Sequence, residues 1–448
     1  MKVIQTYPVH WIKNVFKLLR NPLTYMMEVK DFNPTFVKYD VGGKTYFYLT
    51  ADHEVARHVF QTNHRNYYKS DSLKELQTLI GTGLFTSEGD FWRKQRRLAQ
   101  PAFHRKKLVD LFEIMQVVTK DFAKELEKLA KIGKPFDMFN QMMMITLQVV
   151  TKALFSTGMT DEELQAVYKN LGFLLDHASL RATNPLYITW FKINGQHKKF
   201  LRERQKMDDI VFGIIERRRK EPAGSYSDLL DMLMYAEDAD TGERMSDKQL
   251  RDEIMTFFIA GHETSAIALT WLWYLLEKNP DVMRKLRAEA TEVLGDRMAT
   301  FADLPNLVYT RQTIDETLRM YPPVWATGRT PLETDSIKDY KIPKGSDVLL
   351  FIYAIHHNPE IWENPYQFNP DRFTPELKKK QPKGSYVPFG AGPRLCIGDR
   401  FAIMEMQLIV SEFVRRFDFE LIDKSDRTLK PVSTLRSKEK IEMRVKMR

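Results

Sequence analysis

Cys396 is the only cysteine in the chain and the residue best suited to carry chemistry. It lies in segment 388–398, where three glycines let the backbone turn tightly and approach a flat ligand, and Pro393 stiffens the turn. Apolar residues recur at helical spacing from position 399 onward, so Cys396 precedes a predicted helix N-terminus. Amide N–H groups and the helix dipole at such a place favour a thiolate over a thiol.

The residues around the cysteine form one complete pattern, Phe-x-x-Gly-x-Arg-x-Cys-x-Gly, made by Phe389, Gly392, Arg394, Cys396 and Gly398. A lone cysteine without such surroundings is commonly an inert, buried hydrophobe. The pattern resembles the haem-ligand signature of the cytochrome P450 family. The resemblance implies that the Cys396 thiolate is the axial ligand of the iron of haem b, where it favours O–O cleavage. It also implies that Phe389 and Gly398 lie against the haem and that Arg394 reaches a propionate.

A second candidate site lies in the middle of a long predicted helix. Ser246 to Gln249 form a capping box, and the helical pattern they open continues to Lys278, where Asn279-Pro280 stops it. The centre of this pattern, 260–265, reads Ala-Gly-His-Glu-Thr-Ser. A glycine beside polar residues is costly in a buried helix, so we expect a bulge there.

The polar centre of this helix is not a zinc motif, although a histidine precedes Glu263. A zinc helix needs a second histidine where this chain has Ala266. A purely structural role for Glu263 and Thr264 stays open from this segment alone. The resemblance implies that Ala260 and Gly261 lie against the haem, and that Glu263 and Thr264 organise proton delivery to dioxygen.

Trp92 and Arg96 are four residues apart and therefore share one face of a predicted helix. By spacing alone they describe an exposed basic helix with one anchoring tryptophan. The resemblance implies that both donate to a haem propionate, as does Arg329, which is otherwise an ordinary surface arginine. Lys94 and Arg97 are then expected to point outward, toward an acidic electron donor.

Glu316 and Arg319 lie three residues apart in a predicted helix over 306–320, so they face the same way. Taken alone they are an everyday surface pair. They resemble the Glu-x-x-Arg motif of the family, and Arg372 resembles the arginine that joins that pair. The resemblance implies one buried network that keeps the cysteine loop rigid, because removing any member strands the others.

The pocket walls are predicted only through the resemblance. It implies pocket positions for Phe257, Val324, Trp325, Ala326, Thr327, Ser433 and Thr434. Segment 67–88 is irregular and resembles a variable loop over the pocket, whereas 106–220 is helical in period and mostly scaffold. These variable walls do not identify a substrate, and a hydrophobic small molecule such as a fatty acid or terpenoid is the expectation.

Composition bounds the remaining possibilities. Hydrophobic residues make up 43% of the 448 residues, and no Pro/Gly/Ser-rich linker divides the chain, so we expect one domain over 1–448. One cysteine excludes an intramolecular disulfide and fits a reducing, cytoplasmic compartment. No run of 18 apolar residues predicts a membrane span, although peripheral contact by an N-terminal helix stays open. The net charge of +9 invites an acidic partner, and no recognition motif supports nucleic acid.

The sequence therefore predicts a mainly helical, monomeric haem-thiolate monooxygenase with a small β region, including a hairpin through Gly42-Gly43. It is expected to use O2 and electrons from a separate ferredoxin- or flavodoxin-type donor fed by an NAD(P)H reductase, since no flavin or ferredoxin segment follows Arg448. The alternatives are a non-catalytic haem-binding sensor or carrier, a peroxide-driven enzyme and a binding protein without haem. A sensor or carrier has no need of Glu263 and Thr264. A peroxide-driven enzyme of the same fold lacks that acid–alcohol pair, and a helical binding protein without haem is colourless.

Overall fold

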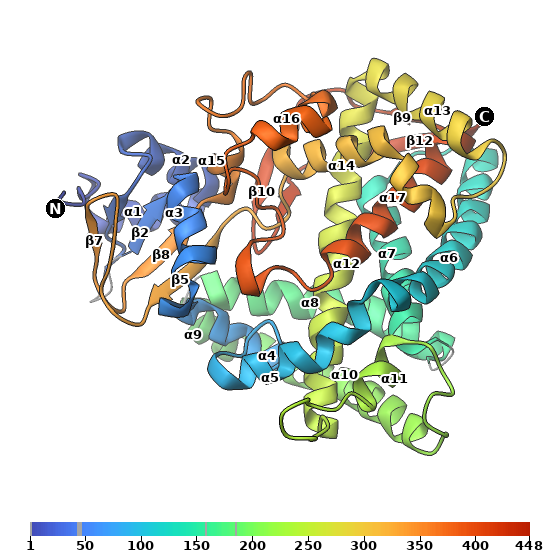
Figure 1. Cartoon of the computed structure of the whole chain (residues 1–448), viewed down its shortest axis with the longest axis horizontal. Coiled ribbons are helices and arrows are strands. Elements are labelled where there is room, and N and C mark those ends of the chain that lie inside the picture. The colour runs from blue at the N-terminus through green and yellow to red at the C-terminus, as the bar shows by residue number, and fades with distance from the viewer. Residues whose placement is uncertain (1, 43–46, 157–158, 184–185) are drawn as a thin grey trace.

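The computed structural model describes residues 2–42, 47–156, 159–183 and 186–448. Helices make up most of the molecule, and the strands form small sheets, the largest of them beside the N-terminus (Figure 1). The predicted fold class, mainly α with a small β region, is confirmed. Among the described residues, none of the helices is both long and apolar enough to cross a bilayer.

The first half of the chain builds a series of helices that begins at the left of Figure 1, beside the N-terminus, and continues around its lower and right-hand parts. They are α1 (Trp11–Arg20), α2 (Pro22–Phe32), α3 (His53–Arg57), α4 (Gln77–Ile80), α5 (Gly89–Ala99), α6 (Arg105–Ile132), α7 (Met138–Phe155), α8 (Asp161–Thr183), α9 (Leu186–Ile193), α10 (Gln196–Arg219) and α11 (Leu229–Met234). The second half adds α12 (Asp247–Lys278), α13 (Pro280–Leu294), α14 (Val308–Met320), α15 (Ile352–His356), α16 (Pro375–Lys380) and α17 (Asp399–Arg416).

The largest sheet has the strand order β1-β2-β8-β5-β3. Its strands are β1 (Val37–Tyr39), β2 (Phe47–Thr50), β3 (Tyr67–Lys69), β5 (Thr327–Pro331) and β8 (Asp347–Leu350). Smaller sheets join β4 (Phe136–Asp137), β12 (Glu442–Met447) and β9 (Phe417–Leu421), then β6 (Asp335–Ile337) with β7 (Tyr340–Ile342), and β10 (Leu429–Pro431) with β11 (Leu435–Ser437). The predicted first hairpin is confirmed by the pairing of Val37 with Leu49, while Gly43 of its turn lies outside the described residues.

The strand β3 was not predicted, since 67–88 has no clear alternation of apolar and polar residues. It pairs antiparallel with β5, which places Lys69 directly opposite Arg329. The register that brings these two cations together depends on residues more than 250 positions apart, so no local pattern could reveal it.

The long helix α12 begins and ends at the predicted residues, with the Ser246 and Gln249 capping box formed. The predicted bulge is wrong, because α12 is helical without interruption. The Thr264 hydroxyl donates to the Ala260 carbonyl oxygen at 2.7 Å, and the Thr146 hydroxyl of α7 donates to the His262 carbonyl oxygen at 2.9 Å. Hydroxyl groups thus satisfy the polar centre without breaking the helix.

The main hydrophobic core surrounds α12 and joins it to α6, α7 and α17. Figure 1 shows α12 crossing the molecule between these helices, with the loop that leads into α17 close by. Two smaller clusters pack between the N-terminal helices and the five-stranded sheet. The helices that carry the predicted site residues are therefore fixed by the largest core, because fully buried elements move least.

Candidate functional site

The cysteine loop is closed by its own backbone. The Cys396 N–H donates to the Phe389 carbonyl oxygen at 3.0 Å, and the Leu395 N–H donates to that of Gly392 at 3.0 Å. Gly392 has φ +71°, and a Cβ atom there would lie 2.0 Å from the carbonyl oxygen of Phe60. Only glycine fits this position, so one of the glycines that marked the sequence pattern is required by close packing.

The side chain of Cys396 is exposed. That exposure is toward a hollow within the molecule, since surrounding protein raises the pKa of the thiol to about 11 through burial, although the Gly398 N–H and Arg96 lower it. The expected preference for a thiolate at the helix N-terminus is thus outweighed by burial. Coordination to a metal is the ordinary way to deprotonate such a thiol.

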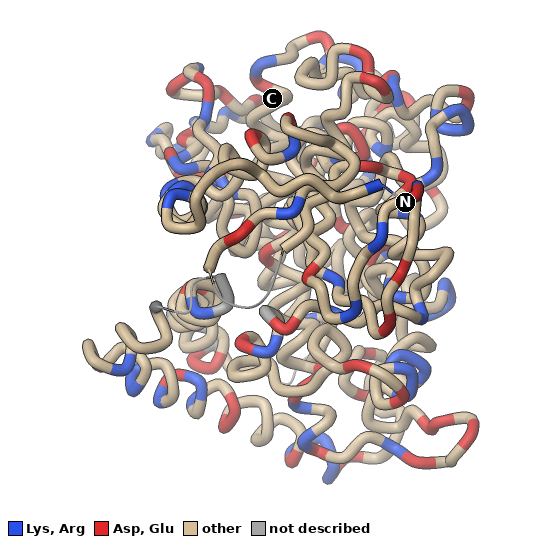
Figure 2. The backbone as a smooth tube through the Cα atoms, turned by 90° about the vertical axis from the view of Figure 1, so that its left-hand side faces the viewer, with Lys and Arg blue, Asp and Glu red and all other residues tan. Residues whose placement is uncertain are grey.

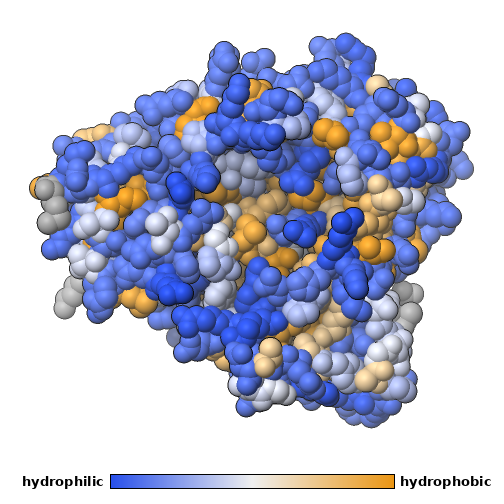
Figure 3. All heavy atoms as spheres, viewed as in Figure 1, coloured by the Kyte–Doolittle hydropathy of each residue, from blue (hydrophilic) through white to orange (hydrophobic). Residues whose placement is uncertain are grey.

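The face of α12 that holds Ala260 fits a flat ligand. Ala260 is exposed, and Gly261 and Thr264 are half-buried, whereas the rest of the second half of the helix is almost completely buried. Figure 3 shows a hollow with apolar residues along its walls in the region where Figure 1 places α12 and the loop leading into α17. Small residues facing such a hollow let a planar group approach the helix backbone.

Three cations gather at one edge of this region. Lys69 Nζ donates to the carbonyl oxygens of Leu84 at 3.0 Å and Ser87 at 2.9 Å. The buried Arg329 guanidinium donates to uncharged partners, the Thr327 hydroxyl at 3.1 Å and a neighbouring carbonyl oxygen. Arg394 pairs with Glu88, whose other oxygen accepts from the Lys69 backbone N–H at 2.6 Å.

These cations repel one another. The pKa of Lys69 is lowered to about 7, mainly by burial; Glu88 opposes the shift, and nearby Arg394 and Arg329 add to it. Burial and Arg394 lower the pKa of Arg329 to about 10. The cluster has more cations than its one paired carboxylate balances, so a ligand with two carboxylates, such as the propionates of haem, fits it. Lys69 was missed by sequence reasoning because nothing local distinguishes it.

Trp92 and Arg96 of α5 both contact the cysteine loop. The Arg394 guanidinium is 5.4 Å from the centre of the Trp92 ring, and Arg96 Nη1 donates to the Leu395 carbonyl oxygen at 2.9 Å. Arg96 therefore braces the loop directly.

Lys94 and Arg97 point away from the loop but are already paired. Lys94 forms an ion pair with Glu243, and Arg97 pairs with Asp238 at 2.9 Å and Asp240 at 3.0 Å. These carboxylates lie in the segment before α12, which folds back over α5. The two cations that we expected to face an acidic donor are therefore already paired with acids of the same chain.

The predicted network of Glu316, Arg319 and Arg372 is formed, with Glu316 and Arg319 completely buried and Arg372 partly exposed. Arg319 donates to both oxygens of Glu316 at 2.7 and 2.9 Å, and Arg372 Nε donates to Oε1 at 3.3 Å. Arg319 also donates to the His356 carbonyl oxygen at 2.8 Å, and the His356 ring accepts the Val387 N–H at 2.9 Å. His356, which sequence reasoning missed, thus connects the network to the residue that precedes the cysteine loop.

The predicted pocket residues differ in how far their side chains are exposed. Val324 and Ser433 are exposed, and Ala326 and Thr327 are half-buried. Phe257 is buried with its ring edge-on to Phe103 at 5.5 Å.

Trp325 and Thr434, also predicted at the pocket, both bond to other parts of the fold. The Trp325 indole packs in the N-terminal core against Phe351 and donates to the Val432 carbonyl oxygen at 2.9 Å. The Thr434 hydroxyl donates to Glu263 Oε1 at 2.6 Å. Both side chains bond where the C-terminal hairpin meets α12 and the segment before β5.

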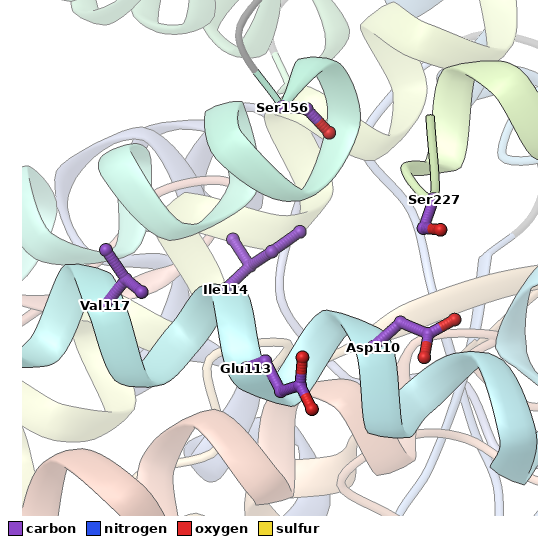
Figure 4. A pocket seen from close by; sticks show the side chains of 6 residues that line it. All are labelled: Asp110, Glu113, Ile114, Val117, Ser156 and Ser227. Carbon is purple, nitrogen blue, oxygen red and sulfur yellow. The ribbon is translucent and has the colours of Figure 1, made fainter. Parts of the chain in front are cut away.

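A cavity of about 320 Å³ lies elsewhere, between α6, the end of α7 and the segment before α11 (Figure 4). Asp110, Glu113, Ile114 and Val117 come from α6, and Ser156 and Ser227 face them. None of the elements that line it carries a predicted site residue, so this cavity is not the candidate active site.

The comparisons with known proteins agree with the geometry. The cytochrome P450 family model matches residues 5–445. Cyclooctatin synthase of Streptomyces melanosporofaciens is 35% identical over 372 residues, covering 83% of this chain and 80% of that protein. Cyclooctat-9-en-7-ol 5-monooxygenase of the same organism is 33% identical over 375 residues, covering 84% and 80%. The crystal structure of the cytochrome P450DA heme domain has a TM-score of 0.90 and 26% identity, covering 100% of this chain and 98% of that one.

Proposed function

Since the chain belongs to the cytochrome P450 family and is a haem-thiolate monooxygenase, we propose that Cys396 is its haem ligand and that the haem is haem b. When bound, the haem supplies the oxygen chemistry. The protein residues hold it, brace its ligand and bring protons and substrate to it.

The observation that carries this proposal is the cation cluster beside the cysteine loop. Lys69 and Arg329 lie directly opposite each other on antiparallel strands, an arrangement that is destabilising for like charges. With Arg394 nearby and Glu88 as the paired carboxylate, the cluster is balanced by a ligand that brings two negative charges. The two propionates of haem meet that requirement.

The proposed roles of the chain's own residues follow from their positions. Arg96 and the glycine turns keep the Cys396 sulfur aimed at the hollow. Thr264, half-buried on α12, holds a water by its hydroxyl, and Glu263 resupplies protons from solvent. Each hydroxylation consumes O2, two electrons and two protons, and yields the alcohol and one water.

The substrate is proposed to be a hydrophobic small molecule such as a terpenoid or fatty acid. One relative is named as the 5-monooxygenase of cyclooctat-9-en-7-ol, which favours a bulky hydrocarbon alcohol or its precursor. Electrons are proposed to come from an acidic ferredoxin- or flavodoxin-type protein, because the chain carries a net charge of +9. We propose a cytoplasmic monomer organised as one domain.

The experiment that tests the haem ligand is Cys396→His. Reduced wild-type protein with carbon monoxide should show the strongly red-shifted Soret band of thiolate-ligated haem, and the variant should lose it because a neutral imidazole donates less electron density. Arg400→Gln, which changes an exposed side chain after the loop, is the control and should keep the band. An unchanged band in Cys396→His would exclude the assignment, and a colourless wild-type protein would exclude haem altogether.

A further inference from the structure

The carboxylate of Glu263 is held by the C-terminal hairpin. Its Oε1 accepts hydrogen bonds from Arg436 Nη2 at 2.7 Å, from Arg436 Nε at 3.2 Å and from the Thr434 hydroxyl at 2.6 Å. Glu263 is 4% exposed. All three donors meet the same oxygen, which leaves Oε2 outside these bonds and able to take and release a proton.

The hairpin that supplies these donors is itself fixed. The Trp271 indole of α12 donates to the Leu435 carbonyl oxygen at 2.9 Å, and the Leu435 N–H donates to the Pro323 carbonyl oxygen at 3.0 Å. Leu435 is completely buried. Arg436 follows Leu435 in β11, so its backbone cannot drift away from α12, and its guanidinium is presented to Glu263 in one place.

Arg436 also borders a second cavity, of about 160 Å³, between α7, α12 and the β10–β11 hairpin. Polar side chains contribute much of the lining, among them Thr270, Lys430, Ser437 and Glu439. Such a cavity holds about five waters at the volume of liquid water. The Arg436 side chain is partly exposed, and Asp176 of α8 lies 3.6 Å from its Nη1. Arg436 therefore stands between the buried carboxylate and a polar cavity.

We propose that Arg436 is the positioning residue for Glu263, and that protons reach Glu263 Oε2 from water in this cavity. Water gives a proton to Oε2, and Oε2 passes it to the water or hydroxyl at Thr264, so one O–H bond breaks and one forms at each transfer. The guanidinium keeps its own protons and fixes Oε1, which sets the direction of Oε2. This inference rests on the proposed function, in which Glu263 resupplies protons.

A purely structural role for Arg436 makes different predictions. If the pair only fastened the hairpin to α12, its loss would lower the stability of the protein and leave the proton supply unchanged. If it positions the relay, its loss slows proton delivery, so reduced oxygen leaves as hydrogen peroxide and the pH dependence of coupling changes. Product formed per NAD(P)H consumed, measured from pH 6 to pH 9, separates the two.

The experiment compares Arg436→Gln and Arg436→Lys with wild type in the haem-loaded enzyme with its electron donors. Arg436→Gln should lower product per NAD(P)H about tenfold, less than the hundredfold or more that a positioned acid or base contributes. Arg436→Lys keeps the charge without the two-point geometry and should fall between. Lys446→Gln, which removes an exposed cation of β12, is the matched control and should match wild type.

Two further measurements test whether Arg436 and Glu263 act together, one by coupling in a double variant and one by unfolding. In Glu263→Gln protein, the added Arg436→Gln change should have no further effect on coupling, because the relay is already lost. In urea unfolding without reductant, the two changes should be non-additive, as expected for residues in contact. If Arg436→Gln does not fold, the test uses Arg436→Lys, and the pH dependence of its product formed per NAD(P)H consumed supports or overturns the inference.

Wild-type coupling and an unchanged pH profile in the Arg436 variants would overturn the inference, as would independent effects of the Glu263 and Arg436 changes. Failure of the proposed function is distinguishable from this. In that case wild-type protein itself makes no product with donors, while the non-additivity in unfolding remains.

Discussion

Two buried polar regions of this molecule differ in how their side chains are paired. At the Glu316 network, Glu316 and Arg319 are completely buried, and their charged atoms bond to one another, to Arg372 and to backbone groups. In the α8–α10 region, His177 is 2% exposed and stacks between Phe191 at 4.5 Å and Phe200 at 4.3 Å. Neither nitrogen of the His177 ring has a hydrogen-bond partner among the described residues.

The two regions therefore differ in how strongly directional bonds fix their geometry. A charge network with all its partners present is costly to break at any one member, so the Glu316 network favours a single geometry for the cysteine loop. The aromatic stack around His177 is held by ring packing and not by hydrogen bonds of the His177 ring, so it imposes less directional constraint on its neighbours. The first region connects through His356 to the residue before the cysteine loop, and α10 of the second packs against α12. Figure 2 shows basic and acidic residues interspersed along the backbone, without a segment of one charge only on the side that it presents.

The largest expected effect is that of Glu316→Ala. It leaves the fully buried Arg319 without its carboxylate and should cost about 3 to 5 kcal/mol, with loss of haem from the purified protein. Arg372→Ala is the matched comparison. Arg372 is partly exposed and bonds to Glu316 at 3.3 Å, so its loss should cost less. Haem content and urea unfolding measure both, and equal effects would contradict a network centred on the Glu316–Arg319 pair.

A smaller effect is expected from His177→Phe, and it depends on pH. The pKa of His177 is lowered to about 4, mainly by burial, with smaller contributions from Arg181 and His197. As the pH falls, His177 takes up a proton near pH 6.5 in the unfolded chain but only near pH 4 in the folded chain. The free energy of unfolding therefore falls between about pH 6.5 and pH 4. Phenylalanine preserves the stack and should remove this contribution.

The measurement is urea unfolding at pH 7 and pH 5. The loss of stability on acidification should be smaller in His177→Phe than in wild type, while His10→Gln, a change at an exposed histidine, should behave as wild type. Other buried histidines keep part of the acid sensitivity, because the pKa values of His356 and His357 are also lowered by burial. Identical pH dependence in wild type and His177→Phe would mean that the stack accepts the proton.

The smallest effect is expected at the exposed pairs of α5. Lys94→Ala removes a cation that Glu243 already neutralises, so the rate of reduction by an acidic donor should change little. Arg400 is exposed in the first turn of α17, close in sequence to Cys396, and Arg400→Glu should slow reduction more. Stopped-flow reduction at rising salt tests this. A rate that is indifferent to salt and to Arg400→Glu would exclude electrostatic docking on this face.

Local sequence patterns predicted the parts of the site that lie within one segment. The cysteine loop, the capping box of α12 and the spacing of Glu316 and Arg319 depend on neighbours a few residues away, where turn chemistry and helix periodicity act directly. The expected bulge in α12 failed although its signal was also local. The hydroxyl groups that satisfy the helix centre include Thr146 of α7, which the local pattern does not contain.

Short patterns predicted the helical class, the glycine-bounded cysteine loop and the proposed acid–alcohol pair, because each pattern has its own local physical reason. Which distant charges meet follows only from the folded arrangement. Strand pairing placed Lys69 opposite Arg329, the hairpin brought Arg436 to Glu263, and α15 carried His356 beneath the cysteine loop. These partners come from segments without a recognisable local motif. Their roles depend on burial and on distances to other residues, which exist only in the folded chain.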